Sequence, residues 1–184
     1  MNLPNKLTVL RICLIPFFVI CVKMDSYAMQ LAAVAIYVAA CATDALDGHI
    51  ARSRGLVTNF GKFMDPIADK LLVMSAMIVL TWQHRMPDWV CILMLGREFL
   101  VSGFRLVAVE NGVVIAAGPL GKLKTVFQML STIALMLLVS TTGEHPLGQA
   151  GATAAYALMV IALILTVVSG ADYIIRNREC IKDM

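Results

Sequence analysis

The chain alternates between long apolar runs and short polar stretches. Six runs approach the roughly 20 apolar residues that a helix needs to cross a bilayer. They lie at roughly 7–23, 28–50, 61–82, 87–109, 120–140 and 152–174. The alternating pattern of a membrane barrel is absent from the sequence, so the runs should be helices. The pattern predicts an all-α, polytopic integral membrane protein with six transmembrane helices, folded as a single domain over residues 1–184.

Turn-forming residues separate these runs, and they gather at 23–26, 83–88, 112–121 and 141–146. The start of the third helix is ambiguous. Thr58 or Asn59 is a suitable N-cap, but a helix that begins there contains Pro66, which removes a backbone hydrogen bond and favours a kink. The alternative is a start nearer Asp65.

The first run also has one feature of a secretory signal peptide, because Ser26-x-Ala28 resembles a cleavage site. Arg11 and Pro16 interrupt the apolar run and favour a retained helix instead. The five cysteines are odd in number and lack the spacing of metal ligands, so we expect free thiols in apolar surroundings.

Composition and charge agree with a membrane protein. Hydrophobic residues make up 60% of the chain, charged residues 15%, and the mean hydropathy is +0.83. The placement of the basic residues is more informative than the net charge of +3. Most of them fall on one side of a six-helix arrangement, which by the positive-inside rule places both termini in the cytoplasm. Because these residues follow topology and form no separate basic face, nucleic-acid binding is not predicted.

Acidic residues occur where the hydropathy pattern predicts membrane. The stretch reads Asp44-x-x-Asp47-Gly48-x-x-Ala51-Arg52, eight residues, then Gly61-x-x-x-Asp65-x-x-x-Asp69. At about 100° per residue the first two aspartates share a helix face, and the last two form an i, i+4 pair. Four converging carboxylates repel one another and need cations. Oxygen-rich sites suit hard divalent ions, and four acids can bridge two of them in a clamp for phosphoryl transfer.

Two other interpretations of the acidic stretch stay open at this point. Small residues such as Gly48, Ala51 and Gly61 allow close helix packing, with the acids paired to Arg52 or Lys62. Acids at membrane depth also serve ion and proton pathways in transporters.

The spacing matches at every fixed position the signature D-x2-D-G-x2-A-R-x8-G-x3-D-x3-D, so the chain resembles the CDP-alcohol phosphotransferase family. The resemblance implies a six-helix fold, a homodimer and two Mg²⁺ or Mn²⁺ ions held by Asp44, Asp47, Asp65 and Asp69. It implies that Asp69 is also the catalytic base. The cytidine nucleotide is expected at Asn5, Thr8, Gly48, Arg52, Thr58 and Gly61.

Three segments resemble the bacterial phosphatidylglycerophosphate synthases, a branch of this family. They are Asn2–Arg11, Gly96–Phe99 with Arg105, and Gly121–Thr125. This resemblance implies transfer of a phosphatidyl group from CDP-diacylglycerol to glycerol 3-phosphate at the bacterial inner membrane, with the active site facing the cytoplasm. An acceptor such as inositol phosphate or serine, or a small cation or proton transporter, is the alternative.

The acceptor phosphate requires a second, basic pocket. Arg97 and Arg105 lie within about 80° of each other on one helix, and arginines inside a span are costly unless they have a function. Glu98 is a candidate to orient one of them, while Lys122 and Lys124 could complete the pocket. The simpler reading of both lysines, and of Lys70 beside Asp69, is that they are topological charges at a cytoplasmic boundary.

Overall fold

The computed structural model describes residues 3–24, 26–53, 59–110, 115, 118–138 and 148–177. Within these ranges, side chains are described except those of residues 3–4, 44–53, 59–60, 62–63 and 110. The described residues form six α-helices and no strand. Their bounds are α1 Leu3–Lys23, α2 Tyr27–Ser53, α3 Asn59–Trp82, α4 Asp88–Glu110, α5 Pro119–Met136 and α6 Gly148–Arg176.

The hydropathy pattern located all six helices, and their ends fall within a few residues of the predicted ones. The larger shifts, of four residues each, are at α1, which begins at Leu3, at α5, which ends at Met136, and at α6, which begins at Gly148. The predicted loop 112–121 overlaps the first turn of α5, because Gly118 is the N-cap and Pro119 begins the helix. Proline is favoured at this position since its fixed φ suits a helix and its missing N–H would have no helical partner.

α3 begins at Asn59 and contains Pro66. The earlier of the two possible starts is therefore the one observed. It extends the helix past Asp65 towards its N-terminal end, so that Gly61, Asp65 and Asp69 follow one another at intervals of four residues on a single helix.

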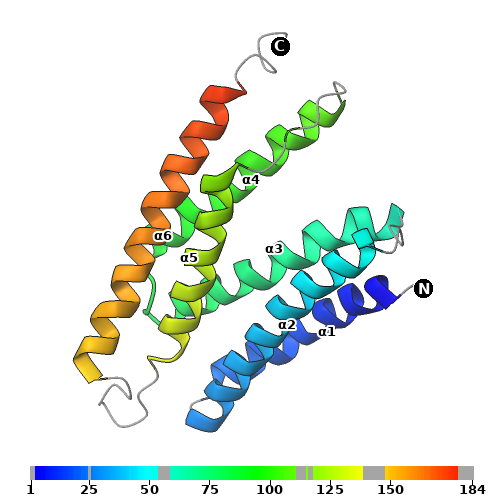
Figure 1. Ribbon diagram of the computed structural model, residues 1–184. Coiled ribbons are helices and arrows are strands. Elements are labelled where there is room, and N and C mark those ends of the chain that lie inside the picture. The colour runs from blue at the N-terminus through cyan, green and yellow to red at the C-terminus, as the bar shows by residue number, and fades with distance from the viewer. Residues whose placement is uncertain are drawn as a thin grey trace.

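Successive helices run in opposite directions, so α1, α3 and α5 begin at the end of the molecule where α2, α4 and α6 finish (Figure 1). α1 packs against α2 and α3, while α6 packs against α5 and α4. Fewer contacts link α2 with α5 and α3 with α4 and α5. The molecule is thus built from two groups of three helices, α1–α3 and α4–α6.

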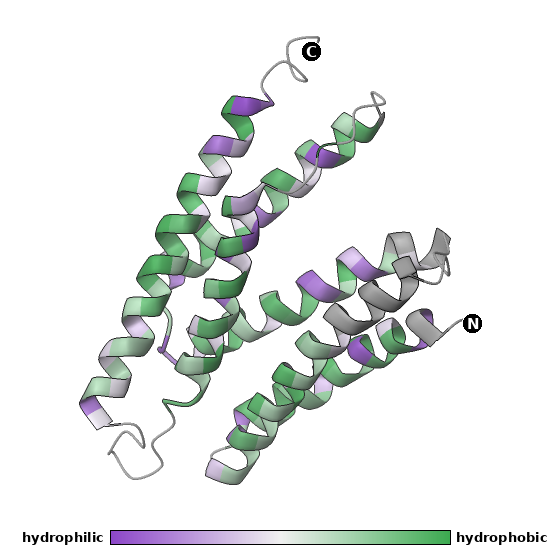
Figure 2. Cartoon of the chain, viewed as in Figure 1, coloured by the Kyte–Doolittle hydropathy of each residue, from purple (hydrophilic) through white to green (hydrophobic). Residues whose placement is uncertain are grey.

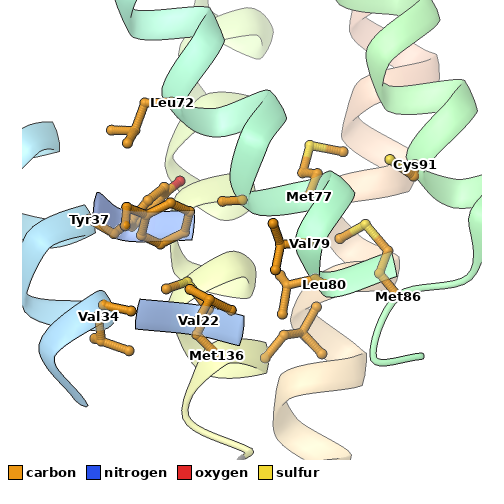
Figure 3. Packing of buried hydrophobic residues seen from close by; sticks show 14 of the residues in the cluster. Val22, Val34, Tyr37, Leu72, Met77, Val79, Leu80, Met86, Cys91 and Met136 are labelled. Carbon is orange, nitrogen blue, oxygen red and sulfur yellow. The ribbon is translucent and has the colours of Figure 1, made fainter. Parts of the chain in front are cut away.

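Apolar side chains join the two groups at the end away from the acidic stretch. Val22, Tyr37 and Leu80 are each at most 1% exposed, and they pack with Met77 and Met136 in one cluster (Figure 3). Nearby, Arg85 donates to the carbonyl oxygens of Leu135 at 3.4 Å and Met136 at 3.2 Å. A cation there complements the negative C-terminal end of α5. Burial lowers the pKa of Arg85, but a guanidinium still carries its charge at neutral pH.

Much of the outer surface is apolar. Large side chains on every helix are exposed, among them Phe17 at 61%, Ile92 at 68% and Leu100 at 66%. Figure 2 shows mostly hydrophobic residues along α1, α2 and α6, with the hydrophilic ones of α3 and α4 gathered nearer the end where α3 begins. A soluble monomer rarely exposes apolar surface on this scale.

Length and hydropathy alone qualify two of the described helices as membrane spans. These are Asn5–Lys23 and Gly148–Arg176, with mean hydropathies of 1.9 and 2.3. Only 33% and 22% of their apolar windows are buried, unlike the core helix of a soluble protein. The remaining helices fall short by this criterion. In α3 and α4, charged residues such as Asp69 and Arg97 interrupt the apolar runs. Two qualifying helices therefore do not establish the six transmembrane spans expected from the sequence.

Candidate functional site

α1 and α3 meet through polar residues at the end where both helices begin. Asn5 and Thr8 of α1 are buried, and so is Gly61 of α3. Thr8 is fully buried and its Oγ1 donates to Oδ1 of Asp65 at 2.5 Å. This bond ties a residue expected to bind nucleotide to one expected to bind metal.

The four aspartates of the signature are only partly within the described side chains. Asp65 is half-buried and Asp69 is exposed, so the carboxylate of Asp69 is accessible to a ligand. Asp44, Asp47, Gly48 and Arg52 lie in the last turns of α2, where the helix is described but the side chains are not. Thr58 lies outside the described residues. Among the side chains that are described, no three of the His, Cys, Asp and Glu residues lie together as a metal site would require.

Asp69 lines a small cleft formed by α3, α4 and α5. We call it the aspartate cleft, and about 60 Å³ of it is open to a molecule of the size of water. Its polar lining residues are Asp69, Lys70, Glu98, Lys124, Thr125 and Gln128. Apolar side chains, including Val73 and Leu95, close the rest of it. The residue expected to act as the base therefore lines a cleft that also contains cationic groups.

A larger cleft adjoins the first. We call it the basic cleft, and about 180 Å³ of it is open to a molecule of the size of water. Its polar side chains come from all four of the helices α3 to α6 and are those of Lys70, Arg97, Glu98, Ser102, Arg105, Thr125, Ser169, Asp172 and Tyr173. Lys70, Glu98 and Thr125 line both clefts. The two clefts are therefore neighbours, with Asp69 lining one and the two arginines lining the other.

Arg97 is held in place by neighbours on three helices. Its Nη1 is 3.2 Å from Oε1 of Glu98, and its Nη2 donates to Oγ of Ser169 at 3.0 Å. Two glycines make room for it: a Cβ added to Gly170 would lie 3.0 Å from Cγ of Arg97, and one added to Gly121 would lie 3.7 Å from Nη2.

Glu98 also pairs with Lys124, whose side chain is almost completely buried. The same carboxylate oxygen thus neutralises part of the charge on two cations. Breaking such a buried pair leaves an uncompensated charge, which costs several kcal/mol, about 3–5 in typical cases. The expectation that Glu98 orients an arginine agrees with this geometry.

Arg105 is exposed and lines the basic cleft, as does Tyr173. Its guanidinium carbon lies 6.0 Å from the centre of the Tyr173 ring, a cation–π distance. Phe104 packs edge-on against the same ring, with centroids 5.6 Å apart. Arg105 is therefore free to meet a ligand with its polar end while the aromatic ring supports it.

The structure does not bring Lys122 into this group. Lys122 is exposed and lines neither of the two clefts, whereas Lys124, two residues later, is buried and lines the aspartate cleft. Two other cations behave differently from simple topological charges. Arg11 of α1 is only 1% exposed, and Lys70 lines both clefts. For Lys70, the position directly after Asp69 was the available signal in the sequence.

Comparison with known proteins decides the family. The model of the CDP-alcohol phosphatidyltransferase family matches residues 1–168. The chain belongs to this family.

Similar proteins of known name cover nearly the whole chain. A CDP-diacylglycerol–glycerol-3-phosphate 3-phosphatidyltransferase of Bacillus subtilis is 41% identical, over 98% of this chain and 97% of its own length. An enzyme of the same name from Rickettsia bellii is 39% identical over 94% of this chain and 93% of its own length. A probable phosphatidylglycerophosphate synthase of Mycobacterium tuberculosis is 40% identical, over 95% of this chain and 81% of its own length.

CDP-alcohol phosphatidyltransferases are membrane-associated enzymes and in general depend on a divalent metal. The described residues fit such a group in two respects. Asp65 and Asp69 present carboxylate oxygens one helical turn apart on α3, which is the donor chemistry that hard divalent ions prefer. The bond from Thr8 fixes one oxygen of Asp65, as an outer partner commonly does for a metal ligand.

Proposed function

We propose that this CDP-alcohol phosphatidyltransferase transfers the phosphatidyl group of CDP-diacylglycerol to sn-glycerol 3-phosphate, releasing CMP and forming phosphatidylglycerophosphate, a precursor of anionic phospholipids. The names of the similar proteins support this reaction. One structural observation carries the choice of acceptor: a cleft with Asp69 adjoins a cleft with Arg97 and Arg105. An acceptor with a hydroxyl group at one end and a phosphate at the other fits both.

The reaction is a displacement at the phosphorus that bears the diacylglycerol. The primary hydroxyl oxygen of the acceptor forms a new bond to this phosphorus, and the bond from the phosphorus to the bridging oxygen of the diphosphate breaks. CMP leaves with the electron pair of that bond. Asp69 takes the proton of the attacking hydroxyl, a role that requires the carboxylate to reach the proton in the bound complex. Its exposure within the aspartate cleft suits that role.

We propose that Asp44, Asp47, Asp65 and Asp69 hold two Mg²⁺ or Mn²⁺ ions. When bound, these ions supply charge neutralisation to the diphosphate and to the departing CMP. Asn5, Thr8, Gly48, Arg52, Thr58 and Gly61 bind the cytidine nucleotide. Burial of Asn5, Thr8 and Gly61 at the junction of α1 and α3 supports a formed pocket there.

Arg97, Arg105 and Lys124 bind the acceptor phosphate in this proposal, and Lys122 remains a candidate from the sequence. Arginine presents a planar fork of donors to phosphate oxygens. Four cations line the clefts (Lys70, Arg97, Arg105 and Lys124) against three carboxylates (Asp69, Glu98 and Asp172), and Glu98 pairs with two of the cations. This excess of positive charge disfavours serine, which brings no phosphate.

We further propose that residues 1–184 form one membrane-embedded domain of a homodimer in the bacterial inner membrane. All six helices cross the bilayer, and both termini and the active site face the cytoplasm. The exposed apolar surface on every helix supports this placement, and so does the concentration of basic residues at the end where α1 begins.

The deciding test is an assay of the purified protein in detergent micelles with CDP-diacylglycerol, Mg²⁺ or Mn²⁺, and labelled glycerol 3-phosphate. We expect labelled phosphatidylglycerophosphate. We also expect Asp69→Asn to lower kcat by at least about 100-fold, since general base catalysis contributes that much or more. Asp88→Asn, at the opposite end, is the matched control. Transfer to inositol phosphate but not to glycerol 3-phosphate would overturn the acceptor assignment.

A further inference from the structure

Lys70 is the cation that stands between the two clefts. It follows Asp69 directly in α3, it is half-buried, and it lines both the aspartate cleft and the basic cleft. A purely topological lysine would extend towards the membrane surface instead. The position of Lys70 therefore calls for another explanation.

The contacts of Lys70 differ from those of the neighbouring cations Arg97 and Lys124. Arg97 and Lys124 both pair with the carboxylate of Glu98. Nζ of Lys70 instead donates to Oγ of Ser102, which in turn donates to the backbone oxygen of Glu98 at 2.6 Å. No carboxylate among the described side chains lies within ion-pairing distance of Nζ. The ammonium group is thus held by a neutral hydroxyl.

An ammonium group has three donors and carries a full charge. The bond to Ser102 uses one donor and leaves the charge without a direct counterion among the described residues. Keeping such a group half-buried is costly unless a ligand supplies the missing anion. The two clefts on either side of Lys70 provide space for that anion.

We infer that Lys70 is a further acceptor-binding residue, whose ammonium group binds the phosphate of glycerol 3-phosphate on the side nearest Asp69. The inference rests on the proposed function and adds a residue that the sequence pattern assigned to topology. In glycerol 3-phosphate a three-carbon chain separates the phosphate from the attacking hydroxyl. A phosphate held by Lys70 and the arginines therefore leaves that hydroxyl within the cleft of Asp69, because Lys70 and Asp69 both line the aspartate cleft.

The kinetic test separates binding of the acceptor from binding of the lipid. We expect Lys70→Gln to raise the KM for glycerol 3-phosphate about tenfold or more, as loss of a hydrogen bond to a charged group does. The KM for CDP-diacylglycerol should stay within about twofold, since Lys70 does not contact that substrate in this proposal. Lys70→Arg keeps the charge and should recover most of the affinity. Lys6→Gln removes an exposed positive charge from the same end and should change neither constant.

Chemical labelling tests the same contact in the wild-type protein, so the result does not depend on whether Lys70→Gln folds. We expect glycerol 3-phosphate, but not glycerol, to slow the acetylation of Lys70 as followed by mass spectrometry, and to leave Lys6 unaffected. An unchanged KM in a folded Lys70→Gln variant, or equal acetylation rates with and without glycerol 3-phosphate, overturns the inference alone. A wild-type protein that transfers nothing to glycerol 3-phosphate overturns the proposed function as well.

Discussion

The hydroxyl of Thr8 is fully buried and donates to Oδ1 of Asp65 on α3, 2.5 Å away. Threonine is stiff at χ1, so the bond restricts the carboxylate as well. A ligand carboxylate held in this way loses less entropy when a cation binds. In the proposed site, Thr8 would therefore act through Asp65 in addition to its proposed place beside the nucleotide.

Removal of this hydroxyl should weaken metal binding. We expect Thr8→Val to raise the Mg²⁺ concentration for half-maximal activity by about 10–100-fold, the usual effect of losing an outer partner of a metal ligand. Thr8→Ser should restore it. The measurement is the initial rate against Mg²⁺ concentration at saturating substrates. Thr81→Val is the matched control, since Thr81 donates only to the carbonyl of Met77 at the far end of α3. An unchanged Mg²⁺ dependence in Thr8→Val contradicts the assignment.

Two lysines of α5 show what the sequence can and cannot decide for a single residue. Lys122 and Lys124 are about 200° apart on a helix, so only one of them can face the helix bundle. The sequence does not say which, because the answer depends on how α5 is rotated against α4. In the structure the partner Glu98 faces Lys124, which is buried, while Lys122 is exposed.

At the scale of the element, α6 contributes to the site through a glycine, whose missing side chain leaves room for Arg97. Gly170 leaves the space that the stem of Arg97 fills, and Ser169 beside it accepts a hydrogen bond from the guanidinium. Glycine in a helix normally costs about 0.5–1 kcal/mol relative to alanine. The close approach of Arg97 explains why a glycine stands at position 170 despite its low helix propensity.

Gly170→Ala should therefore displace Arg97. We expect a several-fold higher KM for glycerol 3-phosphate and an unchanged KM for CDP-diacylglycerol. The added Cβ would lie 3.0 Å from Cγ of Arg97, so that the side chain must shift. The control is Gly103→Ala in α4, where nothing lies within 4 Å of an added Cβ. Equal KM values for both variants and the wild type would show that Arg97 needs no such space.

Helices were the part of the fold that local pattern could predict, because each apolar run carries its own signal of length and hydropathy. The same pattern could not choose between the two possible starts of α3. Pro66 disfavours a helix interior, yet α3 begins at Asn59 and includes it. Contacts such as Ser169 with Arg97, which join residues far apart in the chain, depend on helix packing and leave no local trace in the sequence.

At the scale of the whole molecule, the two groups of helices divide the chemistry. The acidic signature lies in α2 and α3, and the phosphate-binding candidates Arg97, Arg105 and Lys124 lie in α4 and α5. Both clefts form where α3 meets the second group. In the proposed function, the nucleotide is thus bound mainly by the first half of the chain, and the acceptor lies where α3, with Asp69 and Lys70, meets the second half.

The proposed reaction requires that the end of the molecule where α1 and α3 begin face the cytoplasm, because glycerol 3-phosphate enters from there and CMP is released there. Lys6 and Asp88 are exposed and lie at opposite ends, near the start of α1 and at the start of α4. We expect a membrane-impermeant maleimide to label Asp88→Cys in intact cells, and to label Lys6→Cys only after the membrane is opened. The five native cysteines are first replaced, and each variant must retain transferase activity. Labelling of Lys6→Cys in intact cells would reverse the orientation, and would place the clefts on the side of the membrane where their substrates are absent.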